Sequence, residues 1–297
     1  MANLSLSKMP LSKSKSVSSI ENLRSRVDRL FRPPSRRSIG GNQLLLDLPH
    51  MISCESQISS PSKNIAEFLD FISDAMPDGD VYLFGGVIRD LALLGRKGFN
   101  SDIDVVVEGN WSNCVAYLEY LGAHKNKFGG YRLEVDSWPV DIWNAKETWA
   151  IKQGLVEYKG IASLTETTVL NWDAILMNWR TRSFIHTNNY FETMRSRVLD
   201  IVLEENPDPI GMAVRVFRHL CLKEANAITL KAIEYLVNCT RTYSFDDIRD
   251  REYRSYGNSL INPAVYKFFE DFNVNEMLDI KGTNSIVNHI LKKELHL

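Results

Sequence analysis

The sequence has few cysteines, and they lie far apart. Cys54, Cys114, Cys221 and Cys239 form no C-x-x-C pair, which is the spacing typical of zinc sites and redox motifs. This absence argues against a zinc site. It favours free thiols in a reducing compartment.

Long apolar runs and a strong net charge are also absent. No run approaches the roughly 18 residues that a membrane span requires, and the formal net charge is only -2. We therefore expect a soluble, cytoplasmic protein with no membrane partner, in which any attraction to nucleic acid is local. With 297 residues, 44% of them hydrophobic, the chain can bury one large core or two smaller ones. Oligomeric state leaves no mark in the sequence.

Acidic residues are scarce at the N-terminus. Within residues 1–37, nine lysines and arginines face only Glu21 and Asp28, and serine is abundant. A disordered tail, an RNA-binding arm and a targeting peptide share this composition. The stretch that starts at Ile20 is also expected to form a short helix before Pro33 and Pro34. We expect residues 1–61 to be a basic, flexible extension.

The chemistry of the chain is concentrated between residues 81 and 107. An apolar strand at 81–84 leads into a diglycine turn, then a helical segment, and then a second strand at 103–107. Asp102 and Asp104 are two residues apart on that strand, so their side chains project from the same face. Two adjacent carboxylates repel unless a cation lies between them, and Mg²⁺ prefers oxygen ligands and substrate phosphates.

The turn before the helix fits a phosphate-binding site. Gly85 and Gly86 lack a Cβ atom and allow phosphate oxygens to approach backbone N–H groups at the start of the following helix. Arg89 offers a charge-assisted contact to phosphate. A solvated D-x-D and a simple turn remain the plain alternatives when each half is considered alone.

Residues 85–109, GGVIRDLALLGRKGFNSDIDVVVEG, resemble the signature of the DNA polymerase beta-like nucleotidyltransferase superfamily. The similar branch comprises the head domains of bacterial poly(A) polymerases and class II CCA-adding tRNA nucleotidyltransferases, which read G-G-x-V-R-D-x-L-L-G and then D-I-D. The resemblance implies that Asp102 and Asp104 are catalytic metal ligands. It also implies nucleotide binding by Gly85, Gly86, Arg89 and Asp90.

A third metal ligand is expected from the segment that follows. Runs at 131–135 and 139–143 alternate like the strands of a hairpin, and the family places an acidic residue on its second strand. The resemblance implies that Asp141 is this ligand, with Glu134 and Asp136 as alternatives. Arg132 is expected to reach a phosphate or to pair with a carboxylate across the strands.

Two later blocks resemble the family less closely. Asp173 stands where the family usually has asparagine, and it is expected to accept a bond from a ribose hydroxyl or an arginine, or to face solvent. Asp208 is expected to cap a helix that begins at Pro209. Arg215 and Arg218 then share a face at i, i+3 and are expected to contact a nucleotide or RNA phosphate, although a solvated face is the alternative.

The sequence therefore predicts an α/β nucleotidyltransferase head with a short mixed β-sheet flanked by helices at 62–203, followed by an α-helical neck at 204–297. The implied reaction is template-independent transfer of an NMP from an NTP, such as ATP, to an acceptor hydroxyl, with two Mg²⁺ ions and release of pyrophosphate. A tRNA-like RNA 3′ end is the preferred acceptor. The alternatives are a protein hydroxyl and a non-catalytic module that binds nucleotide or RNA.

Overall fold

The computed structural model describes residues 16–31, 63–135, 138–223 and 225–272. Its helices are α1 (Ile20–Phe31), α2 (Lys63–Asp74), α3 (Gly86–Leu93), α4 (Trp111–Tyr120), α5 (Trp149–Lys152), α6 (Tyr190–Ser196), α7 (Pro209–Leu222), α8 (Leu230–Thr242), α9 (Phe245–Tyr256) and α10 (Pro263–Glu270). Its strands are β1 (Asp80–Phe84), β2 (Ile103–Glu108), β3 (His124–Lys125), β4 (Tyr131–Val135), β5 (Trp138–Asn144), β6 (Ile175–Asn178), β7 (Phe184–His186), β8 (Val198–Leu199) and β9 (Ala227–Ile228). Short 3₁₀ helices include residues 145–147, 161–166 and 171–173.

Strands β1 to β7 form one mixed sheet in the order β3-β4-β5-β2-β1-β6-β7. The β2–β5 pair is parallel, and the other neighbours are antiparallel. The antiparallel pairing of β4 and β5 confirms the expected hairpin. Since the connection from β2 to β5 runs through α4 and β4, two segments far apart in the sequence become neighbours at the centre of the sheet.

The two faces of the sheet bury different cores. Alternate residues of β2, Ile103, Val105 and Val107, pack into the main core with α2, α3 and α4. Val106 faces the other way, into a smaller core beneath the segment that carries α5. Asp104 shares the face of Val106, because side chains two apart on a strand point the same way. Asp104 therefore projects from the face of the sheet that carries the smaller core.

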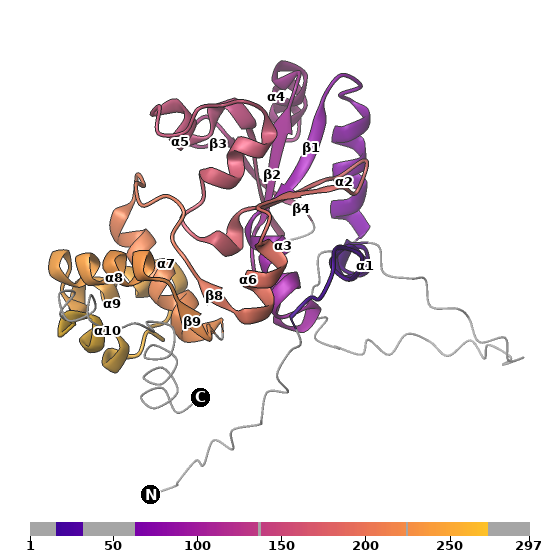
Figure 1. The fold of residues 1–297 in the computed structure, drawn as a ribbon. Coiled ribbons are helices and arrows are strands. Elements are labelled where there is room, and N and C mark those ends of the chain that lie inside the picture. Colours follow the sequence, from indigo (N-terminus) through magenta and orange to yellow (C-terminus); the bar gives the residue numbers. More distant parts are fainter. Residues whose placement is uncertain (1–15, 32–62, 136–137, 224, 273–297) are drawn as a thin grey trace, which may run out of the picture.

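Helix α1 packs against α3 (Figure 1). Leu23, Val27 and Leu30 recur at helical spacing and are fully or almost fully buried. Arg26 donates to the carbonyl oxygen of Leu91 at 2.7 Å. The expected helix is thus confirmed, but the expectation of flexibility is wrong for this stretch. The basic composition of this segment gave no indication of the apolar face of α1. The rest of the predicted extension lies outside the described residues.

We expect Leu23→Ala to lower the free energy of unfolding by about 2–5 kcal/mol, because it removes a fully buried side chain and leaves a cavity. Chemical denaturation of the full chain measures this change. The matched control is Arg29→Ala on the exposed side of the same helix. Equal, small effects of the two changes would show that α1 is not part of the core.

The neck consists of α7 to α10, which gather to one side of the sheet (Figure 1). The main core continues into the neck without a break, through Phe217, Leu236 and Phe269. The parallel pair β8–β9 also joins the two parts. The predicted α/β head with a mixed sheet, followed by a helical part, is therefore confirmed.

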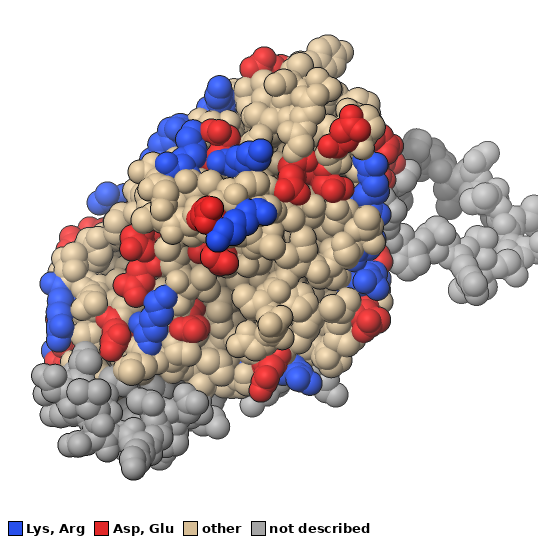
Figure 2. All heavy atoms as spheres, turned by 45° about the horizontal axis from the view of Figure 1, so that its top comes forward, with Lys and Arg blue, Asp and Glu red and all other residues tan. Residues whose placement is uncertain are grey.

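The cysteines and the helix lengths agree with the composition. Cys114, Cys221 and Cys239 are free thiols, as expected, and Cys54 lies outside the described residues. Within the described ranges, no helix has both the length and the apolarity that a membrane span requires. Basic and acidic side chains are interspersed on the face shown in Figure 2. This mixing agrees with a net charge close to zero.

Candidate active site

A cleft of about 720 Å³ opens where the sheet meets α7. The diglycine turn, the ends of β2 and β5, and the cleft-facing side of α7 line it. Asp102, Asp104 and Asp141 all border this cleft. A larger hollow of about 820 Å³ lies between α2, α4 and β4, but it contains none of the three predicted metal ligands.

The diglycine turn allows a ligand to approach the backbone closely. Gly85 adopts a φ of 57°, a left-handed conformation that other residues rarely adopt. A Cβ atom on Gly86 would lie 2.3 Å from the hydroxyl oxygen of Ser101, which leaves no room for a side chain. The first N–H groups of α3 follow directly, and both glycines line the cleft. Backbone donors are thus available beside the acids.

The strand register brings the acids together. Asp104 on β2 lies directly opposite Asp141 on β5 in the parallel pair. Asp102 immediately precedes β2, and Trp138 fixes its segment by donating from Nε1 to the carbonyl oxygen of Ser101 at 3.3 Å. The alternative ligand Glu134 lies on β4 opposite Pro139, away from Asp104. Asp136, the other alternative, lies outside the described residues.

Arg132 lies between two of the three carboxylates. Its Nη1 donates to Oδ2 of Asp141 at 3.0 Å, and its Nη2 donates to Oδ2 of Asp102 at 2.8 Å. The register explains the contact, since Arg132 is opposite Asp141 in the β4–β5 pair. Of the two contacts expected for Arg132, the structure has the cross-strand ion pair.

Crowding of negative charge changes the titration of the acids. Burial and the neighbouring Asp141 carboxylate raise the pKa of Asp104 to about 7, and the positive charge of Arg215 opposes the rise. Burial also raises the pKa of Asp141, against the effect of Arg132. Asp102 and Asp141 each form an ion pair with Arg132, whereas Asp104 forms none with a described residue. A further positive charge near Asp104 would therefore be stabilised strongly.

The donor set fits Mg²⁺, which prefers carboxylate oxygens and retains positions for phosphate. Within the described residues, however, no group of three His, Cys, Asp or Glu side chains is arranged to hold a metal ion. Arg132 binds one oxygen of Asp102 and one of Asp141. Its guanidinium therefore occupies carboxylate oxygens that a metal ion at these acids would use.

Arg89 is part of a buried ion-pair network. Its Nε donates to Oδ1 of Asp90 at 2.9 Å, its Nη1 donates to Oδ1 of Asp173, and only 7% of the residue is exposed. These two carboxylates raise the pKa of Arg89 although burial opposes the charged form. In the structure Arg89 is engaged by these two carboxylates, and nucleotide binding by Arg89 and Asp90 stays a prediction. The structure gives Asp173 an arginine partner, one of the contacts expected for it.

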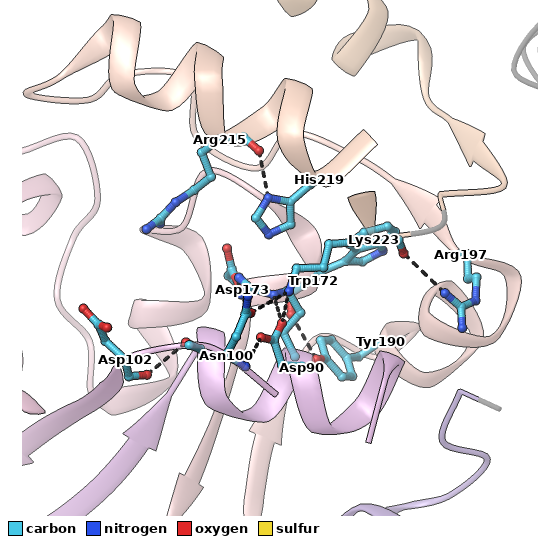
Figure 3. Close-up of polar contacts among 12 residues, drawn as sticks. Asp90, Asn100, Asp102, Trp172, Asp173, Tyr190, Arg197, Arg215, His219 and Lys223 are labelled. Atoms are coloured by element: carbon cyan, nitrogen blue, oxygen red, sulfur yellow. Dashed lines mark hydrogen bonds and ion pairs between the residues drawn. The ribbon is translucent and has the colours of Figure 1, made fainter. Parts of the chain in front are cut away.

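The network extends into the neck through a lysine that the sequence analysis missed (Figure 3). Lys223 donates from Nζ to Oδ1 of Asp90 at 3.0 Å and to Asn100 at 3.2 Å. Burial lowers the pKa of Lys223, while Arg89 and Lys223 together hold the pKa of Asp90 below its usual value despite its burial. The Asp90 carboxylate of the head thus binds Lys223 at the C-terminal end of α7, the first helix of the neck.

His219 on α7 was also missed. Its Nδ1 lies 2.7 Å from the carbonyl oxygen of Arg215, which can only accept, so Nδ1 carries the proton. Burial and the nearby Arg89 charge hold the pKa of His219 well below its usual value. Arg215, His219 and Lys223 recur at i, i+4 and i+8. A polar stripe of this spacing along a largely apolar helix was the available signal.

The two predicted neck arginines have different surroundings. Arg215 is exposed and lines the cleft, and the described residues provide no hydrogen-bond or ion-pair partner for its side chain. It extends from α7 on the side of the cleft where Asp102 lies (Figure 3). Arg218 instead pairs with buried Glu252 and stacks on Tyr256 at 4.0 Å. Asp208 caps α7 as expected and pairs with Arg251.

We expect Asp104→Asn to raise the unfolding temperature in EDTA, and more so at pH 8.5 than at pH 5.5. The folded-state pKa of about 7 lies above the ordinary value of 3.8. The charged form therefore destabilises the fold from pH 3.8 upwards, and fully above pH 7. Thermal unfolding at both pH values tests this expectation, with exposed Asp74→Asn as the control. An increase that does not depend on pH would contradict it.

Comparison with known proteins agrees with this arrangement at the level of the domain. A family model described as a nucleotidyltransferase domain matches residues 63–200. Comparison with curated proteins gives no match.

Among solved structures, the chain is similar to a CCA-adding enzyme in complex with ATP, with 18% identity over 70% of this chain and 50% of that chain and a TM-score of 0.47. It is also similar to a Thermotoga maritima CCA-adding enzyme in complex with tRNA, with 19% identity over 77% and 52% of the chains and a TM-score of 0.45. A third similar structure is a tRNA-processing enzyme, with 16% identity over 82% and 64% of the chains and a TM-score of 0.49.

The chain spans about half the length of the first CCA-adding enzymes that it matches. These distant similarities carry no argument about substrates. The domain match stands apart from them, and it covers the diglycine turn and all three acids. Residues 63–200 of this chain therefore belong to the nucleotidyltransferase domain family.

Proposed function

We propose that this protein is a magnesium-dependent nucleotidyltransferase that transfers an NMP from an NTP to an acceptor hydroxyl and releases pyrophosphate. The observation that carries the proposal is the register that sets Asp104 opposite Asp141 beside the diglycine turn. Asp102, Asp104 and Asp141 would hold the ions. Bound Mg²⁺ would neutralise the triphosphate and lower the pKa of the attacking hydroxyl.

The residues of the chain bind and orient the reactants. The backbone N–H groups after Gly85 suit the triphosphate, and Arg215 adds a positive charge from the other side of the cleft. The acceptor oxygen forms a bond to the α-phosphorus, the bond to the β-phosphate oxygen breaks, and the proton of the hydroxyl passes to solvent. The paired residues Arg89, Asp90 and Asp173 shape the floor of the cleft and hold α7 in place.

We propose a tRNA-like RNA 3′ end as the acceptor. The resemblance of residues 85–109 to poly(A) polymerases and CCA-adding enzymes supports this choice, and the exposed Arg215 agrees with a phosphate-rich ligand. The second candidate is a non-catalytic module that binds nucleotide or RNA. It is favoured by one observation, namely that Arg132 engages two of the acids in the structure.

Labelled nucleotides separate these possibilities. The purified protein is incubated with Mg²⁺, total RNA and each α-labelled NTP in turn, and the label is followed into RNA and into protein. Incorporation into RNA supports the proposal and identifies the nucleotide. Label in protein would replace the RNA acceptor with a protein hydroxyl. With no transfer to either acceptor but retained NTP binding, the non-catalytic module would be correct.

A further inference from the structure

We propose that Arg132 is a built-in counter-ion of the acid cluster, which a divalent cation displaces and which then binds the phosphates of the incoming NTP. Metal ion and nucleotide would consequently bind cooperatively. This inference rests on the proposed function and adds a positioning residue to it. It concerns a residue outside the diglycine and D-x-D motifs.

The guanidinium bridges acids from two different strands. Asp141 is on β5 and Asp102 precedes β2, and Arg132 reaches both from β4 with separate nitrogens, at 3.0 and 2.8 Å. The fork of N–H donors on arginine matches such a pair of carboxylates, whereas a single ammonium group does not. Each bond uses the Oδ2 oxygen of its carboxylate.

Arg132 and a divalent cation require the same carboxylates. In the structure, the guanidinium occupies one oxygen of Asp102 and one of Asp141. The side chain of Arg132 is 52% exposed, and that of Asp102 is 46% exposed. Exposed ion pairs contribute only about 0.2–1 kcal/mol each. The contact is therefore weak enough for a divalent ion to replace it, and strong enough to weaken metal binding.

A displaced Arg132 remains at the cleft. It lines the same cleft as the diglycine turn and Arg215. Other cations that line this cleft are already paired, Arg89 and Lys223 with buried carboxylates and Arg218 with Glu252. Arg132 and Arg215 are thus the cleft-lining cations of the described residues that can turn to a triphosphate. A guanidinium suits that contact, because it binds phosphate through parallel hydrogen bonds.

Mn²⁺ binding without nucleotide gives the most direct test, since free Mn²⁺ is measured by electron paramagnetic resonance. We expect Arg132→Gln to bind Mn²⁺ about tenfold more tightly than the wild type, because two competing ion pairs are lost. The Mn²⁺ affinity of Arg132→Lys should lie between those of the wild type and Arg132→Gln, because lysine cannot bridge both acids. Affinity for non-hydrolysable analogues of ATP and CTP should fall in Arg132→Gln when Mg²⁺ is saturating. A residue that only supports the fold would weaken Mn²⁺ binding instead.

The control variants separate this inference from the proposed function. Lys125→Gln removes a positive charge from the neighbouring strand β3, where Lys125 is exposed and makes no ion pair with a described residue. It should leave Mn²⁺ affinity within about twofold of the wild type, which is less than half a kcal/mol. Asp104→Asn should abolish Mn²⁺ binding. Unchanged or weaker Mn²⁺ binding by Arg132→Gln would overturn the inference. Unchanged binding by Asp104→Asn would instead overturn the proposed metal site.

Discussion

Asp104→Asn should lower the rate of nucleotidyl transfer by about 10³-fold or more, because metal ions at this site contribute several kcal/mol and each 1.36 kcal/mol is tenfold. Asp104 is the second acid of the D-x-D pair, and it lies on β2 directly opposite Asp141 on β5. The loss should appear in kcat with saturating NTP. Initial rates of pyrophosphate release measure it.

Asp74→Asn is the matched control for this loss. It removes a carboxylate from the exposed end of α2, far from the cleft-lining residues. The Asn variant at 104 should fold at least as stably as the wild type, so that a drop in rate reports on chemistry. Transfer that persists in Asp104→Asn at more than about a tenth of the wild-type rate, a cost below 1.4 kcal/mol, would remove Asp104 from the catalytic site.

Arg89→Ala should lower the free energy of unfolding by about 3–5 kcal/mol, since it leaves buried Asp173 without its ion-pair partner and leaves buried Asp90 with Lys223 alone. For a chain of this size, that loss lowers the unfolding temperature by about 10 °C. Arg89→Lys should be intermediate, because lysine retains the charge but not the two-sided geometry of the guanidinium. Thermal unfolding of the full chain measures both variants.

Exposed Lys97 provides the control for Arg89. Lys97→Ala removes a positive charge a few residues along the chain, where the side chain is open to solvent. Its unfolding temperature should match that of the wild type. A direct phosphate ligand at position 89 predicts the opposite pattern, in which Arg89→Ala binds NTP poorly while its stability is unchanged. That result would restore the role expected from the sequence.

The sequence predicted the features that depend on local periodicity. Alternation at residues 103–107 put Asp102 and Asp104 on one face, and the hairpin at 131–143 brought Asp141 to the neighbouring strand. The period of a strand was enough for the D-x-D pair and the hairpin, whereas the position of Asp141 beside Asp104 was implied by the resemblance to the family. A short helix before Pro33 was also expected, and α1 confirms it.

Partners distant in the sequence were beyond such reasoning. Asp173 follows Arg89 by 84 residues and Lys223 follows Asp90 by 133, so no local pattern indicates that they meet. The phosphate contact expected for Arg89 stays a prediction, and its pairing with two buried acids was not foreseen. Arg218 was similarly expected to be available for phosphate, although Glu252 binds it from α9.

The basic N-terminus shows how composition can mislead. The many arginines and serines favoured a flexible extension, but Val27 and Leu23 pack in the core and Arg26 binds backbone carbonyl oxygens at the end of α3. Long basic side chains reach such oxygens while the apolar face of the same helix is buried. The buried apolar face of α1 is thus a feature that the basic composition did not indicate.

The central claim is that three acids from two adjacent strands hold divalent ions against a nucleoside triphosphate. Crystals grown with a non-hydrolysable NTP analogue and Mn²⁺ test it through anomalous scattering at the manganese edge. The account predicts a manganese peak among the carboxylates of Asp102, Asp104 and Asp141, with Arg132 released from Asp102 and Asp141. A peak elsewhere, or none with the analogue bound, would contradict it.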